Sequence, residues 1–386
     1  MDYLRESLGF KVRKVGRYLR LYGPLRTWAK VQAQRHQRRT FDRLPPRREP
    51  SANQTVALIG CGNYQFSTIA YYLNMSFGRV IAGCMDRNVD RAASLSRHYS
   101  IPFYTTDASE LLDREQVRLV YIASNHASHA EYASEALARG KDVYIEKPHV
   151  VSVDQLDRLT AAMKRSPGRV YLGFNRPGSR LGRIAREYLS AESGPGMYNW
   201  FVAGHQIDPD HWYFRPEEGG RVLGNLCHWT DFLLSLVPYS AFPVRIVPTR
   251  TSKSDCDIAV TYTFGEGSIG AITFSAKGHT FEGVKERFSA HKGNVLLALD
   301  DFQRLQVEVI DRKRVYRNLF RDHGHQTNIV GAYENSTQQG RYDRDERLAY
   351  IANTALLFLK TKQALDENRE ITVESFARPK AITKAG

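Results

Sequence analysis

A short apolar segment that ends in two opposite charges marks the first candidate site. The segment reads Lys141-Asp-Val-Tyr-Ile-Glu-Lys-Pro-His149. Its apolar core predicts a strand, and Pro148 ends that strand because proline has no N–H for a further sheet hydrogen bond. In an open parallel sheet the ligand crevice lies beyond the carboxyl ends of the strands, so Glu146, Lys147 and His149 would lie where a cofactor meets a substrate. The alternative is a surface turn after an edge strand.

A glycine-rich turn earlier in the chain has the spacing of a dinucleotide-binding site. The apolar run Thr55–Ile59 leads into Gly60-Cys-Gly62-Asn-Tyr-Gln65 and then into a helical stretch. Gly60 would permit the tight turn, Gly62 would let a pyrophosphate approach the backbone, and the helix would offer its N-terminal amides to the phosphates. Gln65 departs from the pattern, because a glycine or alanine there would allow closer packing of the helix.

An acidic residue follows the next apolar run. Asp86 comes directly after residues 79–85 and lies 24 residues after Gly62. A carboxylate at this spacing binds the ribose hydroxyls of NAD and repels the 2′-phosphate of NADP, so NAD is the predicted cofactor. Arg87 could accommodate that phosphate, which keeps NADP as the alternative. Asp86 could instead cap the helix expected over residues 88–98.

A third apolar run, residues 118–122, opens into Ala-Ser-Asn-His-Ala-Ser-His. Ser124 and Asn125 end this strand on the ligand side and are predicted cofactor contacts. His126 and His129 are interpreted as a loop histidine and a helix-start histidine, because no carboxylate or thiol is spaced with them as a third metal ligand. The repeated alternation of strand and helix predicts a parallel, doubly wound sheet.

The second half of the chain has the pattern of antiparallel strands. Apolar and polar residues alternate between Asp, Gly or Lys turns over residues 244–251, 256–264, 267–274 and 286–290. A helical pattern over residues 344–365 is expected to return to the first domain.

The charge of the chain is concentrated at its start. Residues 1–50 hold 14 Lys or Arg against 4 Asp or Glu, so they carry +10 of the net +14 of the 386 residues. The nearly neutral remainder argues against nucleic-acid binding by the main domains. The four cysteines have no C-x-x-C spacing, which favours reduced buried thiols over disulfides or a zinc site. With no apolar run of about 18 residues and no signal-peptide pattern, we expect a cytoplasmic protein, with a peripheral membrane location as an extension of that expectation.

The basic N-terminal segment has helical periodicity. Gly23-Pro24 divides it into two expected helices, and a proline-stiffened linker follows at residues 43–50. The apolar stripe could pack on its own protein or on another subunit, lie on an anionic membrane surface, or accompany nucleic-acid binding. The stripe consists of Leu8, Val12, Val15, Leu19, Leu25 and Trp28.

Taken together, these motifs resemble those of the Gfo/Idh/MocA oxidoreductases, the family of glucose-fructose oxidoreductase and inositol dehydrogenase. The resemblance covers about residues 54–375 and is closest to members associated with polysaccharide and nucleotide-sugar biosynthesis. The matching segments, in order, are Gly60-Cys-Gly-Asn63, the Ala-Ser-Asn-His-Ala-Ser-His turn, Ile145-Glu-Lys-Pro148, Leu172-Gly-Phe-Asn-Arg176, Pro209-Asp-His-Trp212, Glu218-Gly-Gly-Arg-Val-Leu-Gly-Asn-Leu-Cys-His228 and Lys285-Glu-Arg-Phe288.

The resemblance implies an α/β plus α+β fold: an N-terminal Rossmann doubly wound parallel sheet and a C-terminal mixed, largely antiparallel sheet. The exposed face of the second sheet commonly makes oligomer contacts in this family, so a homodimer or homotetramer is expected. The expected domains are an extension and linker at 1–50, a dinucleotide-binding domain at 51–173 and a substrate-binding domain at 174–386.

The resemblance also implies roles for individual residues. Lys147 would stabilise charge on the substrate oxygen and His228 would act as acid or base. The expected cofactor contacts are Gly60, Gly62, Asn63, Tyr64, Asp86, Arg87, Ser124, Asn125, Glu146 and Lys147. The expected substrate contacts are Asn175, Arg176, His211, Trp212, Asn225 and Asp231.

One departure weakens the catalytic interpretation. Many relatives carry an aspartate four residues before the histidine, where this chain has Gly224. Asp231, three residues after His228, could orient the imidazole or form an ion pair at the surface.

The motifs together predict an NAD(P)-dependent oxidoreductase acting on a sugar, nucleotide- or carrier-linked. The alternative is a non-catalytic NAD(P)-binding regulatory or scaffold protein.

Overall fold

The computed structural model describes residues 7–208, 210–249, 257–277, 281, 283–338 and 340–376. The chain divides into two compact units. The parallel-sheet unit comprises Gly23–Phe174 and His325–Leu348, and the mixed-sheet unit comprises the described parts of Met1–Tyr22, Asn175–Gly324 and Ala349–Gly386. Pro209 of the Pro209–Trp212 motif and Cys256 lie outside the described residues.

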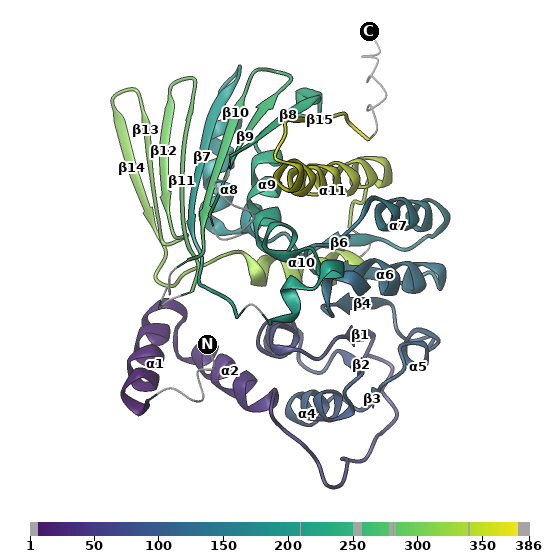
Figure 1. The fold of residues 1–386 in the computed structure, drawn as a ribbon. Helices are drawn as coiled ribbons and strands as arrows, with labels where there is room; N and C mark the ends of the chain where they lie inside the picture. The colour runs from purple at the N-terminus through teal and green to yellow at the C-terminus, as the bar shows by residue number, and fades with distance from the viewer. Residues whose placement is uncertain are drawn as a thin grey trace. The chain divides into compact units, whose positions relative to one another are not determined.

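The parallel-sheet unit contains one six-stranded sheet in the order β3-β2-β1-β4-β5-β6, with every neighbouring pair parallel (Figure 1). Its strands are short apolar runs that are buried almost throughout, as expected for a sheet covered on both faces. The doubly wound parallel sheet is therefore confirmed. The strands are β1 (Val56–Ile59), β2 (Ile81–Met85), β3 (Phe103–Thr105), β4 (Leu119–Ile122), β5 (Asp142–Ile145) and β6 (Val170–Leu172).

Helices connect these strands in the alternation that the sequence predicts. The connecting elements are the π-helical turn η1 (Gln65–Ile69) with its continuation α3 (Ala70–Phe77), α4 (Val89–Tyr99), α5 (Ser109–Leu112), the 3₁₀ turn η2 (His126–Ser128), α6 (His129–Ala138) and α7 (Val153–Arg165). Two further helices belong to this unit: α2 (Pro24–His36) precedes β1, and α10 (His325–Thr337) comes from a later part of the chain.

The chain returns to the parallel-sheet unit through α10. Ile329 of this helix is fully buried, and its carbonyl oxygen accepts a hydrogen bond of 2.7 Å from the Tyr121 hydroxyl on β4. The predicted helix at 344–365 is α11 (Arg344–Glu367). Only its first residues, up to Leu348, belong here, and from Ala349 onward it belongs to the mixed-sheet unit. Arg347, for example, donates to the carbonyl oxygen of Val170 at 2.9 Å.

The mixed-sheet unit contains a nine-stranded sheet in the order β14-β13-β12-β11-β7-β10-β9-β8-β15. Only β7 and β10 pair in parallel among these neighbours, so the sheet is mixed and largely antiparallel, as expected. The strands are β7 (Gly196–Ala203), β8 (Val244–Thr249), β9 (Asp257–Phe264), β10 (Ile269–Ser275), β11 (Lys285–Lys292), β12 (Val295–Asp300), β13 (Arg304–Val309), β14 (Arg312–Arg317) and β15 (Ile371–Val373).

Alternating side chains give this sheet one buried and one exposed face. Trp200 of β7 and Phe288 of β11 are buried, whereas Phe201 on the other face of β7 is half exposed. α8 (Arg180–Ser190), α9 (Cys227–Leu234) and α11 share the hydrophobic core with the buried face (Figure 1). Shorter turns complete the unit: η3 (Arg176–Gly178), η4 (Trp212–Phe214), η5 (Pro216–Glu218), the π-helical turn η6 (Val222–Leu226) and η7 (Tyr239–Ala241).

The two predicted N-terminal helices are present and separated at Gly23. α1 (Leu8–Tyr22) belongs to the mixed-sheet unit and α2 to the parallel-sheet unit. All six apolar residues of the predicted stripe, from Leu8 to Trp28, are exposed. Both helices instead bury their other faces, so packing of the stripe on the chain's own units is not observed.

Two further sequence-based expectations concern cysteines and membrane spans. Cys61, Cys84 and Cys227 are buried and form no disulfide among the described residues. None of the helices in the described part of the chain combines the length and the apolar character that a membrane crossing requires.

Candidate functional site

The glycine turn follows β1, next to β4, at the point where the strand order of the parallel sheet reverses. Gly60 has a φ of +86°, and a Cβ added there would lie 2.6 Å from the backbone nitrogen of Ser124. Both the left-handed backbone and the close approach require glycine. Open α/β sheets bind their ligands at this point of the topology.

The second glycine faces open space. A Cβ added at Gly62 would meet no atom within 4 Å, and the chain becomes helical at Asn63, directly after it. A pyrophosphate could therefore approach this backbone and the first amides of the helix. The residues present fit a dinucleotide at the turn.

Gln65 replaces the small residue expected in the first helical turn. Its side chain is completely buried, and its amide group has no hydrogen-bond partner among the described residues. The helix accommodates the larger side chain in a widened π turn, η1, before it continues as α3. The close α-helical packing of the standard motif is thus replaced by a local expansion.

Asp86 follows β2 and is held by the glycine turn. Its Oδ2 accepts a hydrogen bond of 2.8 Å from the Cys61 backbone N–H, and its Oδ1 accepts one of 2.9 Å from Asn88. The alternative role as cap of α4 belongs to Asn88, whose side chain accepts from the Arg91 N–H at 3.2 Å. The carboxylate is therefore fixed beside the turn, and Arg87 next to it is exposed.

Replacing Asp86 by alanine should weaken NAD binding by at least about tenfold. Each hydrogen bond to a charged group contributes about 1.5 to 3 kcal/mol, and the variant would lose those that we expect Asp86 to make to the ribose. Isothermal titration calorimetry with NAD measures the change. Asp113→Ala removes a carboxylate that pairs with Arg139 at 2.6 Å and should leave the affinity unchanged. Equal affinity in the Asp86 variant and the wild type would contradict the assignment.

The turn after β4 is a small hydrogen-bonded unit. The hydroxyl groups of Ser124 and Ser128 lie 2.7 Å apart, and Ser128 also donates to Oδ1 of Asn125 at 2.7 Å. Ser124 and Asn125 are both partly exposed at the carboxyl end of the strand. They lie on the predicted ligand edge of the sheet.

His129 connects this turn to the segment after β5. Its Nδ1 lies 2.8 Å from the carbonyl oxygen of Pro148, and its Nε2 lies 3.2 Å from that of Ser124. Burial lowers the pKa of His129 to about 4, although both carbonyl contacts oppose the shift. His129 is thus a buried, neutral histidine at the start of α6, and its single ring N–H can donate to one of the two carbonyl oxygens at a time.

Because burial lowers the pKa of His129, we expect the parallel-sheet unit to lose stability as the pH falls. Above pH 6.5 the histidine is neutral in both states; as the pH falls towards 4, only the unfolded chain takes up a proton, so the free energy of unfolding decreases. The expected slope is about 1 kcal/mol for each pH unit in this window. Denaturant unfolding of His129→Gln should show a shallower slope, whereas exposed His291→Gln should match the wild type. Burial also lowers the pKa values of His36, His98 and His211, which accounts for a remaining slope. An unaltered profile in His129→Gln would contradict the prediction.

Glu146 and Lys147 follow β5 at the same edge. Glu146 is buried, and a Cβ added at Gly173 would lie 2.3 Å from its Oε2. The lack of a side chain at Gly173 therefore leaves space for the carboxylate. Burial and the nearby Glu146 raise the pKa of Tyr64 well above its ordinary value. Lys147 is half-buried and precedes a cis peptide bond to Pro148. The structure thus brings the predicted residues of the parallel-sheet unit to the ends of β1, β2, β4 and β5.

The contribution of α2 to this site was missed by sequence reasoning. Its His36 places Nε2 2.7 Å from the Cys61 carbonyl oxygen and Nδ1 2.9 Å from the Ser94 hydroxyl, and its ring stacks on Phe66 at 4.4 Å. Arg26 donates to the Thr68 hydroxyl at 2.8 Å, within η1. α2 therefore contacts the glycine turn through His36 and the π turn η1 through Arg26.

His228 lies in the first turn of α9 in the mixed-sheet unit and is mostly buried. Asp231 is fully buried, so a surface ion pair is excluded. Its Oδ1 accepts hydrogen bonds from the hydroxyl groups of Tyr350 at 2.6 Å and Thr354 at 3.1 Å, both on α11. Asp231 therefore connects α9 to α11.

Arg176 has a different environment from that expected of a substrate contact. The side chain is buried, and Nε donates to Oε2 of Glu286 at 3.0 Å while NH2 donates to Oε1 at 2.5 Å. The indole N–H of Trp229 donates to the same carboxylate at 3.2 Å. The guanidinium therefore forms a buried ion pair that connects η3 to β11.

The other predicted substrate contacts lie near turns of the same unit. His211 and Trp212 are partly exposed, and Nδ1 of His211 accepts from the Tyr213 N–H at 3.3 Å. Asn175 and Asn225 each contain one buried amide atom without a hydrogen-bond partner among the described residues, Nδ2 and Oδ1 respectively.

Residues 54–174 match the family model of Gfo/Idh/MocA, an oxidoreductase family with an NAD-binding Rossmann fold. The matched region contains all six strands of the parallel sheet. The motif-based resemblance is therefore supported for this part of the chain.

Individual relatives agree with that match. Oxidoreductase P35 from Formosa agariphila is 31% identical over 119 residues, which cover 31% of this chain and 37% of the relative. Inositol 2-dehydrogenase from Gluconacetobacter diazotrophicus is 36% identical over 104 residues, 26% of this chain and 31% of the relative. The chain spans from about a third to three fifths of the length of the curated relatives it matches.

The likeness to solved structures extends over both units. A levoglucosan dehydrogenase in complex with NADH and levoglucosan aligns with a TM-score of 0.71 and 18% identity, covering 83% of this chain and 99% of that one. At this identity the comparison shows a shared fold.

Proposed function

We propose that this protein is an NAD-dependent oxidoreductase that transfers a hydride between the nicotinamide and a secondary alcohol or ketone of a sugar or polyol. The observation that carries the proposal is the glycine turn between β1 and β4 with the Asp86 carboxylate hydrogen-bonded to it. This arrangement suits the pyrophosphate and the adenosine ribose of a dinucleotide. The nicotinamide, when bound, supplies the hydride chemistry.

NAD is the preferred cofactor in this proposal. The Asp86 carboxylate would hydrogen-bond the ribose hydroxyls and would repel a 2′-phosphate. Exposed Arg87 is the feature that would allow NADP, so both cofactors belong in the test.

Lys147 and His228 have separate proposed roles. Oxidation of an alcohol requires removal of the hydroxyl proton and stabilisation of negative charge on the oxygen. The Lys147 ammonium suits the second task, and the His228 imidazole suits the first.

The proposed substrate is a sugar, nucleotide- or carrier-linked. The motifs of the second half, among them Glu218–His228, support this through their similarity to members associated with nucleotide-sugar biosynthesis. The partly exposed side chains of His211 and Asn225 carry hydrogen-bonding groups of the kind that suit sugar hydroxyl groups.

Self-association through the nine-stranded sheet is also proposed. Its outer face exposes large apolar side chains on four strands, β7, β10, β12 and β14, which disfavours a solitary unit in water. These side chains are Met197, Phe201, Ile269, Leu296 and Val315.

Turnover with a panel of substrates tests the function. Purified protein is mixed with NAD or NADP and with free sugars, polyols and nucleotide sugars, and the absorbance of the reduced cofactor is followed. We expect reduction of NAD with at least one sugar or polyol. Tight binding of NAD without turnover across the panel would favour the non-catalytic binding protein, for which the replacement at Gly224 is the supporting observation.

A further inference from the structure

Helix α1 is fixed to the mixed-sheet unit along one face. Leu21 is buried, and its carbonyl oxygen accepts a hydrogen bond of 2.7 Å from the Arg321 backbone N–H. Arg321 also donates to the Tyr22 hydroxyl at 3.2 Å, and Phe10 packs edge-on against Phe281 at 5.3 Å. The orientation of α1 on this unit is therefore set by contacts along its whole length.

The opposite face of α1 carries an apolar stripe that nothing in the described chain covers. Leu8, Val12, Val15 and Leu19 are 77%, 63%, 39% and 41% exposed. Because an α-helix has 3.6 residues per turn, positions spaced by four, three and four lie on one side. We call these four residues the exposed stripe.

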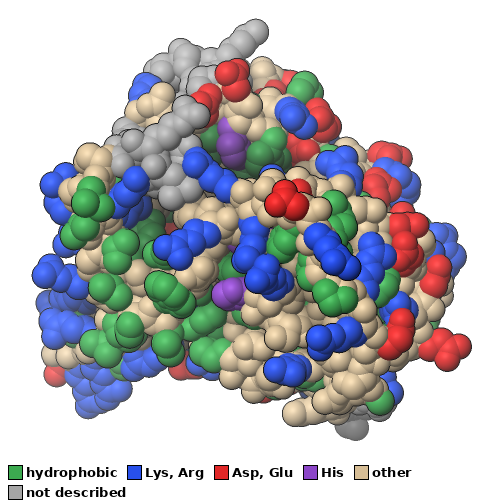
Figure 2. Space-filling model, turned by 90° about the horizontal axis from the view of Figure 1, so that it is seen from below, with side chains coloured by type: hydrophobic (Ala, Val, Ile, Leu, Met, Phe, Trp, Pro, Cys, Tyr) green, Lys and Arg blue, Asp and Glu red, His purple; other side chains and the backbone are tan. Residues whose placement is uncertain are grey.

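Basic side chains border the exposed stripe. α1 contains five Lys or Arg and no Asp or Glu. At 100° per residue, Arg13 and Arg20 lie on one flank of the stripe and Lys11 on the other. Figure 2 shows hydrophobic side chains bordered by Lys and Arg on the side of the molecule where Figure 1 places α1.

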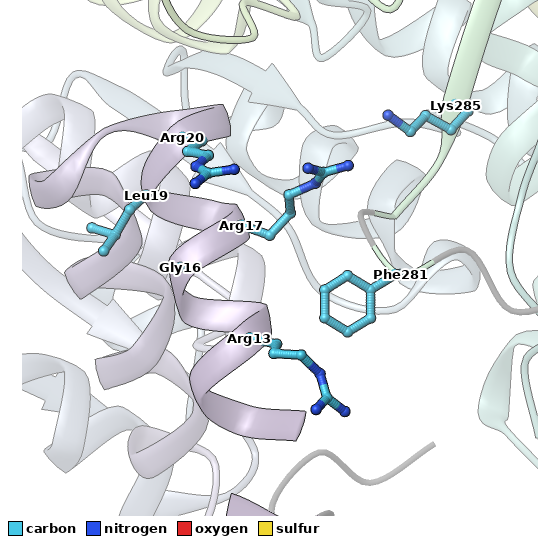
Figure 3. Close-up of a pocket in the computed structure, with 7 residues that line it drawn as sticks. All are labelled: Arg13, Gly16, Arg17, Leu19, Arg20, Phe281 and Lys285. Carbon is cyan, nitrogen blue, oxygen red and sulfur yellow. The ribbon is translucent and has the colours of Figure 1, made fainter. Parts of the chain in front are cut away.

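A basic hollow adjoins the same helix. Its volume is about 840 Å³, and its lining includes four cationic side chains and no carboxylate (Figure 3). One of these cations, Lys285, has an ion-pair partner in Asp301 at 3.2 Å. The lining residues are Arg13, Gly16, Arg17, Leu19, Arg20, Phe281 and Lys285.

We propose that α1 docks this protein on an anionic lipid bilayer. The exposed stripe would enter the boundary between head groups and acyl chains, and Arg13, Arg20 and the basic hollow would hold lipid phosphates. Helices with this division of faces lie in the membrane interface, where apolar insertion and attraction to anionic lipid act together.

Two other partners fit the surface less well. Nucleic acid would use the cations but would leave the apolar stripe in water. A second copy of α1 would cover the stripe but would bring the bordering cations of both helices together, which is unfavourable. An anionic bilayer would take up the exposed stripe among its acyl chains and would pair its phosphates with the bordering cations.

Sedimentation with lipid vesicles tests the proposal on the full-length protein. We expect binding to vesicles of phosphatidylcholine and phosphatidylglycerol at low salt, weaker binding at high salt, and little binding to phosphatidylcholine alone. Arg13→Gln/Arg20→Gln should weaken the partition coefficient by about 30-fold, equivalent to about 1 kcal/mol for each cation. Leu8→Ser/Leu19→Ser should weaken it by at least about tenfold, because less apolar surface is inserted.

Matched double variants in the same unit serve as controls. Ile310→Ser/Leu319→Ser removes two apolar side chains elsewhere that are more exposed than Leu8 and Leu19, and Arg183→Gln/Arg312→Gln removes two exposed cations. Both should bind vesicles like the wild type. Equal losses in the controls, or no binding to anionic vesicles at low salt, would overturn the proposal. A change of oligomeric state in the Leu8/Leu19 variant without vesicle binding would identify a second copy as the partner. NAD binding in solution should be the same in all variants, so this test is independent of the proposed function.

Discussion

Replacing Lys147 or His228 by alanine should lower turnover by at least about 100-fold, while the affinity for NAD falls much less. A positioned group that transfers a proton contributes about 10²- to 10⁴-fold to the rate, and a charge that stabilises the reacting oxygen contributes on a similar scale. The kcat and KM of each variant, measured with the best substrate of the panel, would show the loss in kcat rather than in KM.

Two control variants make this test specific. Lys141 lies at the other end of the strand segment that leads to Lys147, and its ammonium donates to the Arg114 carbonyl oxygen at 2.9 Å. His291 is an exposed histidine on β11. Lys141→Ala and His291→Ala should retain turnover within a fewfold of the wild type. Full activity in a Lys147 or His228 variant would remove that residue from the mechanism.

Replacing Glu286 by glutamine should lower the free energy of unfolding by about 3 to 5 kcal/mol. The substitution preserves the shape but leaves the Arg176 guanidinium buried without an opposite charge. It also weakens the bond from Trp229, which reaches Oε2 at 3.2 Å. Denaturant unfolding of the variant measures the loss from the shift in midpoint.

A surface pair and a double variant complete the experiment. Glu308 pairs with Lys313 at 3.0 Å in a partly exposed setting, so Glu308→Gln should cost less than about 1 kcal/mol. Arg176→Met/Glu286→Leu should be more stable than Glu286→Gln, because removing both partners leaves no unpaired charge. A loss in Glu286→Gln no larger than in Glu308→Gln would show that the ion pair does not stabilise the unit.

The parallel sheet and its edge could be predicted because their signals are local. Each strand is a continuous apolar run, and the residues with polar groups come directly after it, as Asp86 follows β2. Once the runs are accepted as parallel strands, the topology alone brings their carboxyl ends to one edge. No knowledge of distant contacts is required for this step.

Contacts between distant segments could not be predicted in the same way. Arg176 and Glu286 are 110 residues apart, and nothing near either residue indicates its partner. In α2 the apolar residues Leu25 and Trp28 are exposed, whereas the buried face contains small and polar residues such as His36. Hydrophobic periodicity identified the helix, but it could not show that the face packed within the described chain is the one with small and polar residues.

The two π-helical turns also constrain how the chain tolerates insertions and deletions. A π turn closes with a hydrogen bond one residue longer than that of an α-helix, so η1 and η6 each hold one residue in excess. Deleting Gly224 would allow η6 to close as ordinary α-helix. Every residue before the deletion would then rotate by about 100° around the helix axis relative to His228. The direction of the candidate acid–base group relative to Glu218 and Arg221 thus depends on the number of residues in η6 as well as on their types.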